Sequence, residues 1–291
     1  MLGDVELQEH IQQHVNTLAF GLILAIITGY FAWHKGFFRP FPFTCVPVIS
    51  GKSVLKGFMA FILAELIVFP ALLEVITQIF FDISLQHLSS IAKGWVNVLI
   101  IFGGFLAVLM VYFDLNLNVR LQIFKQTPLV WYKQLSIGIQ AWLISYPFVM
   151  VLSQLLAILM LVIFKQPATE QIVVENFKRI LSSPLLVSVT ALEIIVLVPI
   201  TEEFLFRGLL QNWLKSQFKH TSLAIGVTSL IFALFHFSTK QGITNIELLF
   251  SLFILSSFLG FIYEKQGSLW ASIGLHGFFN MMSVIFILMS K

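Results

Sequence analysis

The polar residues that could do chemistry lie inside sequence that is otherwise strongly apolar. Glu202 and Glu203 are neighbours in the run from Pro199 to Gly208, and Arg207 follows four residues after Glu203. On a helix, Glu203 and Arg207 share a face and can form an ion pair. Glu202 points about 100° away from Glu203, because an α-helix has 3.6 residues per turn. Glu202 is therefore the acid left free to act on something else.

Two histidines and an asparagine fall in later apolar segments. His236 follows Phe232 by four residues, and His276 precedes Asn280 by four. Polar groups inside a bilayer must find each other or water, so we expect these side chains to meet Glu202 in one water-accessible site. A carboxylate beside an imidazole can deprotonate water, and a second imidazole with an amide can donate hydrogen bonds to an oxyanion. Together they suit hydrolysis of an amide bond.

A zinc site is the second interpretation of the same residues. Glu202, His236 and His276 would supply three ligands, the usual number at a catalytic zinc. The compact two-histidine helix motif is absent from the sequence, and an asparagine is a better oxyanion donor than zinc ligand. We therefore expect no metal and no other cofactor. Cys45 is the only cysteine, has no histidine beside it, and is not expected to be a nucleophile.

Three further acids lie inside apolar segments. Glu65 and Glu74 flank Pro70, and Glu193 precedes Glu202 in the same segment. None has an obvious partner in the sequence. We interpret them as structural, either as hydrogen-bonded acids or as helix-packing contacts, and a place on a substrate path is the alternative.

The composition indicates which elements position these residues. Of 291 residues, 58% are hydrophobic and 11% are charged, and the mean hydropathy is +0.94. A soluble domain carries about 25% charged residues, so this chain is predicted to be a polytopic membrane protein. A net charge of +3 reflects Lys and Arg in loops and does not indicate a nucleic-acid partner. The expected partners are the lipid bilayer and a membrane-associated protein or peptide.

The apolar segments predict an all-α bundle of about eight transmembrane helices, since a span needs about 20 apolar residues. The predicted segments are Val15–Trp33, Gly57–Phe80, Trp95–Phe113, Ile137–Phe164, Leu185–Leu210, Ser222–Phe237, Ile246–Tyr263 and Leu269–Met289. Ten Lys and Arg residues fall in loops on one side and six on the other, which favours both termini outside. The polar loop 165–183 predicts a boundary between an N-terminal part, 1–182, and a C-terminal part, 183–291.

In order and spacing, the motifs resemble those of the CAAX-protease and bacteriocin-processing (CPBP, or Abi) family, which includes the eukaryotic type II prenyl-protein endopeptidase. The resemblance covers about Pro184 to Met289. It is carried by Glu202-Glu203-x-x-x-Arg207, Phe232-x-x-x-His236 and His276-x-x-x-Asn280, with the flanking words Val198-Pro199-Ile200, Phe206-Arg207-Gly208 and Gly267-Ser268-Leu269-Trp270.

The resemblance implies an intramembrane endopeptidase whose active site opens into the membrane. By position, Glu202 would activate water with help from His236, while His276 and Asn280 would stabilise the oxyanion. The residues that would support the site are Glu203, Arg207 and Phe232. We expect the protein in a bacterial inner (plasma) membrane, where a prenylated substrate is not expected.

Two other functions remain as alternatives. The family also contains members without known proteolytic activity, so a membrane scaffold or bacteriocin-immunity protein is one alternative. A transporter that uses the buried acids as a proton path is another. A transporter predicts inverted repeats between the two halves, and we find no convincing repeat in the sequence.

Overall fold

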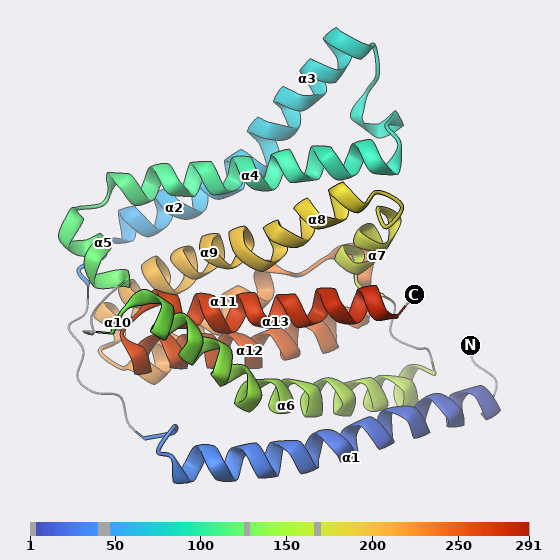
Figure 1. The fold of residues 1–291 in the computed structure, drawn as a ribbon, viewed down its shortest axis with the longest axis vertical. Helices are drawn as coiled ribbons and strands as arrows, with labels where there is room; N and C mark the ends of the chain where they lie inside the picture. The colour runs from blue at the N-terminus through green and yellow to red at the C-terminus, as the bar shows by residue number, and fades with distance from the viewer. Residues whose placement is uncertain (1–3, 40–46, 125–128, 166–169, 291) are drawn as a thin grey trace.

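The computed structural model describes residues 4–39, 47–124, 129–165 and 170–290, which form helices joined by short connections (Figure 1). No β-strand occurs within these ranges. Cys45 lies outside them. The α-helices are α1 (Asp4–His34), α2 (Gly51–Leu63), α3 (Phe69–Phe81), α4 (Ser90–Asp114), α5 (Leu117–Phe124), α6 (Trp131–Phe164), α7 (Ile172–Arg179), α8 (Pro184–Leu192), α9 (Val198–Glu203), α10 (Asn212–Phe218), α11 (Thr221–Phe235), α12 (Thr244–Gln266) and α13 (Leu269–Met289).

The predicted polytopic helical bundle is confirmed. Among the described residues, seven helices are long and apolar enough to cross a membrane, and α11 is a shorter apolar helix at the sixth predicted segment. The start of α1 lies at the same end of the bundle as the end of α13 (Figure 1). The seven apolar helices make the chain an integral multi-pass membrane protein.

Two of the long apolar segments contain a widened, π-helical turn just before a proline. These turns are η1 (Ala64–Val68), before Pro70, and η3 (Glu193–Leu197), before Pro199. Proline has no backbone N–H, so the regular hydrogen-bond ladder is interrupted there, and the bonds shift to donors five residues along the chain. Beyond η1, α3 leans away from the bundle (Figure 1). A third π-helical segment, η4 (Phe204–Gln211), directly follows Glu203.

The buried core joins the N-terminal and C-terminal parts of the chain. One apolar cluster packs Val54, Val108 and Ile123 against Leu205 and Leu209 of η4. A second cluster packs side chains of α6 against side chains of α12 and α13. Helix α8 begins at Pro184, next to the predicted boundary at residue 183. The division into two parts stays a prediction, and the two parts share their cores.

Candidate active site

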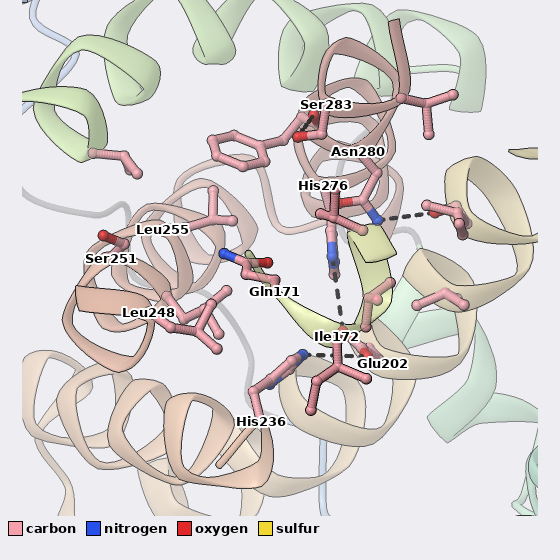
Figure 2. A pocket seen from close by; sticks show the side chains of 18 of the residues that line it. Gln171, Ile172, Glu202, His236, Leu248, Ser251, Leu255, His276, Asn280 and Ser283 are labelled. Atoms are coloured by element: carbon pink, nitrogen blue, oxygen red, sulfur yellow. Dashed lines mark hydrogen bonds and ion pairs between the residues drawn. The ribbon is translucent and has the colours of Figure 1, made fainter. Parts of the chain in front are cut away.

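Four side chains predicted to be catalytic line one cavity of about 840 Å³: Glu202 of α9, His236 directly after α11, and His276 and Asn280 of α13. Figure 2 shows the side chains of His236 and His276 directed toward Glu202 from separate helical segments, while the amide of Asn280 is directed to the carbonyl oxygen of Ile194. The structure brings Glu202, His236 and His276 together and places Asn280 on the lining of the same cavity. Their catalytic roles remain predictions.

Glu202 lies between the two imidazoles. Its Oε1 is 3.8 Å from Nε2 of His236 and its Oε2 is 3.7 Å from Nε2 of His276. Both distances suit ion pairs and exceed a direct hydrogen bond. Oε2 is buried and has no hydrogen-bond partner among the described residues. Glu202 therefore keeps the capacity to accept a proton or a hydrogen bond from a molecule in the cavity.

Each imidazole is oriented through its other ring nitrogen. Nδ1 of His236 is 2.9 Å from the carbonyl oxygen of Phe232, and Nδ1 of His276 is 2.9 Å from Oε1 of Glu203. A carbonyl and a carboxylate can only accept, so both Nδ1 atoms carry a proton. Both Nε2 atoms then face Glu202. Because Nδ1 already carries a proton, donation from Nε2 of His276 requires a second proton on the ring.

Glu203 and Arg207 form the buried ion pair that their spacing predicted. Nη1 of Arg207 donates to Oε1 of Glu203 at 2.8 Å, and both side chains are fully buried. Nη2 of Arg207 donates to the carbonyl oxygen and to Oγ of Ser256, at 3.0 and 2.6 Å. The guanidinium carbon lies 4.8 Å from the ring centre of Phe232. The ring of Phe232 also packs against the rings of His236 and His276. The ion pair is therefore linked through Phe232 to both imidazoles.

Asn280 is held by a carbonyl group that Pro199 leaves unpaired. In η3 the N–H of Val198 donates to the carbonyl oxygen of Glu193, five residues earlier. The equivalent donor for Ile194 would be residue 199, which is a proline and has no N–H. Nδ2 of Asn280 donates to this oxygen at 2.9 Å instead. One amide N–H of Asn280 is therefore occupied, and one is left for the predicted oxyanion role.

Residues 184–282 match the family described as Type II CAAX prenyl endopeptidase Rce1-like. This region belongs to the CAAX-protease family. The predicted resemblance is thereby confirmed over a stretch that starts with α8, ends within α13 and contains all seven predicted site residues. Comparison with curated proteins and with solved structures gave no match. Residues 1–183 lie outside the CAAX-protease match.

Sequence reasoning missed three residues in or beside this cavity. Ser256 anchors Arg207 from α12, and no motif distinguishes it from the nearby Ser251 and Ser257. Glu65 of η1 lines the cavity from the N-terminal part, outside the CAAX-protease region. The position of Glu65 inside a predicted membrane-spanning segment already indicated a special role, although we interpreted that role as structural. Gln171, before α7, also faces the cavity (Figure 2).

The other two acids within apolar segments differ from Glu65. Oε2 of Glu74 accepts a hydrogen bond from the backbone N–H of Leu85 at 3.0 Å, which supports the predicted structural role. Glu193 is buried at the first position of η3 and does not belong to the cavity lining. In the part of the chain that the structure describes, no three His, Cys, Asp or Glu side chains are arranged to bind one metal ion. The expectation of metal-free chemistry remains a prediction.

Proposed function

We propose that the protein is an intramembrane endopeptidase that hydrolyses a peptide bond of a membrane-associated substrate. The observation that carries this proposal is the environment of Glu202. Its carboxylate faces a cavity between two oriented imidazoles, while the adjacent Glu203 binds Arg207 and His276 through Oε1. A carboxylate without a hydrogen-bond partner within membrane-spanning helices is costly and is retained mainly for function.

In the proposed reaction, Glu202 takes a proton from a water molecule that attacks the carbonyl carbon of the substrate. His236 lies 3.8 Å from Glu202 and orients this water through Nε2. His276 and the free amide N–H of Asn280 donate to the oxyanion of the tetrahedral intermediate. Glu203 and Arg207 hold His276 in place and do not touch the substrate.

The cavity lies among membrane-spanning helices, so we propose substrates that are anchored in or cross the bilayer. The proposed location is the plasma membrane of a bacterium, where a prenyl group is not expected on the substrate. A non-catalytic scaffold or immunity protein would have the same fold, and the experiment below distinguishes the two.

The test is cleavage of a membrane-tethered peptide library, with prenylated and unmodified members, by the purified protein in detergent. Wild type is expected to cut a defined peptide bond, and Glu202→Gln to cut it about 10²–10⁴-fold more slowly, the usual contribution of a general base. Glu74→Gln is the matched control, because Glu74 lies outside the cavity lining. A wild-type protein that binds peptides and leaves every bond intact would favour the scaffold.

A further inference from the structure

Glu65 is a second carboxylate in the proposed active site, and it comes from the part of the chain that the family match does not reach. It lines the same cavity as Glu202. No described donor lies within hydrogen-bond distance of its carboxyl group. An acid in a membrane-spanning helix with no structural partner indicates a functional role.

The local structure directs this carboxylate. Glu65 is the second residue of η1, the widened turn before Pro70. Its side chain crosses Gly104 of α4, where an added Cβ would lie 2.6 Å from Oε1 and 2.7 Å from Cγ of Glu65. Any side chain at residue 104 would therefore displace the Glu65 carboxyl group. The proline and the glycine together give Glu65 a defined place in the cavity wall.

The charges around the cavity favour a state in which Glu65 and Glu202 together hold one proton. The described lining residues include no Lys or Arg. The third acid of the lining, Glu247, accepts a hydrogen bond from Ser153 at 2.5 Å. The cation of the proposed mechanism, doubly protonated His276, lies 3.7 Å from Glu202 and favours Glu202 as the ionised carboxylate. Glu65 has no such cation beside it, so the proton is expected on Glu65, as one of two paired acids is protonated in other hydrolases. One of the two is then an acid while the other is a base.

We propose that Glu65 is a catalytic acid that protonates the leaving nitrogen of the substrate. This inference rests on the proposed endopeptidase function and assigns Glu202 and Glu65 opposite roles in it. Water adds to the carbonyl carbon as Glu202 takes one of its protons. The C–N bond then breaks, its electron pair stays on nitrogen, and nitrogen takes the proton of Glu65. Glu202 returns its proton to Glu65, so one water and one amide become one acid and one amine.

The test compares two probes with the same sequence. One is the membrane-tethered peptide that wild type cleaves in the library, and the other carries an ester in place of the scissile amide. An alkoxide departs without prior protonation far more readily than an amide nitrogen. Glu65→Gln is therefore expected to slow amide cleavage about 10²-fold or more and to leave ester hydrolysis close to wild type. Glu202→Gln is expected to slow both reactions, because both need activated water.

A second variant keeps the acid and moves it. Gly104→Ala is expected to slow amide cleavage selectively, because its Cβ displaces the Glu65 carboxyl group, and this variant also serves if Glu65→Gln does not fold. Glu74→Gln is expected to cleave both probes like wild type. Equal losses on amide and ester in Glu65→Gln and Gly104→Ala, or no loss on either, would overturn the role of Glu65 and leave the endopeptidase intact. A wild-type protein that cleaves no member of the peptide library would remove both proposals.

Discussion

Two adjacent carboxylates on one helix have opposite environments. The side chain of Glu203 is fully buried and binds both Arg207 and His276 through Oε1. The side chain of Glu202 is 17% exposed, faces the cavity and makes only the longer contacts with the two imidazoles. The difference follows from the angular step of about 100° between neighbouring residues of a helix. One acid faces the helices packed against it and the other faces open space.

This difference shows how one short motif can both build a site and act in it. Glu203 uses its charge to hold Arg207 and His276, so replacing it should alter the protein itself. Glu202 holds little of the surrounding structure, so replacing it should alter chemistry alone. Fold and activity can therefore be separated experimentally at neighbouring positions. The following predictions are in order of decreasing effect.

The largest effect is expected for Glu202→Gln. The variant should lose about 10²–10⁴-fold in cleavage rate, since it cannot accept a proton from water, while its melting temperature stays close to that of wild type. Cleavage of the tethered peptide and thermal unfolding in detergent, measured on one preparation, check both statements. Glu203→Gln is the matched comparison and should lose stability. Equal melting temperatures of Glu202→Gln and Glu203→Gln would contradict the different roles assigned to the two acids.

Arg207→Ala should destabilise the protein by about 3–5 kcal/mol, because it leaves the buried Glu203 carboxylate without its cation. Denaturant unfolding in mixed micelles measures this change. The double variant Arg207→Met with Glu203→Leu should regain much of the stability, since it removes both charges together. It should remain slow in cleavage, because His276 loses the acceptor at Nδ1. Unchanged stability in Arg207→Ala would show that the pair is not the anchor of this site.

Asn280→Ala should slow cleavage about 10²–10³-fold if the free amide N–H donates to the oxyanion. It should also cost about 1 kcal/mol of stability, because the carbonyl oxygen of Ile194 loses its donor. A loss of stability without a loss of rate in the purified variant would restrict Asn280 to support of η3. Steady-state cleavage and thermal unfolding of the same sample separate these effects.

The smallest effect is expected from chelation. If Glu202 acts as a base on a water that no metal holds, strong chelators should leave cleavage by purified protein unchanged. Elemental analysis of the active preparation is the accompanying measurement. A stoichiometric zinc whose removal abolishes cleavage, and whose return restores it, would make Glu202 a metal ligand. The contrast between Glu202 and Glu203 would then be between a ligand and its support.

Much of the architecture was predictable because it depends on local sequence. Long apolar runs predicted the spanning helices, and the spacing of Glu203 and Arg207 predicted their ion pair. The helices extend beyond the predicted spans where polar residues continue them: α1 begins at Asp4, well before the predicted start at Val15. Apolarity defines the part of a helix that fits the bilayer, and hydrogen bonding defines the helix itself.

The remaining features depend on packing between helices, which no local pattern specifies. Ser256 could not be chosen from its neighbours, because its role comes from the place where α12 meets Arg207. Glu65 was noticed and assigned to structure, because nothing in the sequence indicates that η1 borders the same cavity as α9. The hydrogen bond from Asn280 to the carbonyl oxygen of Ile194 could be inferred from Pro199 only once the two helices are known to be adjacent.

The widened turn η3 also bears on how relatives of this chain should be aligned and engineered. A π-helical turn holds one residue more than an α-helical turn, so η3 is geometrically equivalent to the insertion of one residue before Pro199. Deleting one residue from 193–197 would let this turn close as a regular α-helix, with bonds four residues apart, while α8 and α9 keep about the same faces. A relative without this residue would have a straight helix here without the widened turn. A gap of one position here therefore has structural meaning and should not be closed to improve an alignment score.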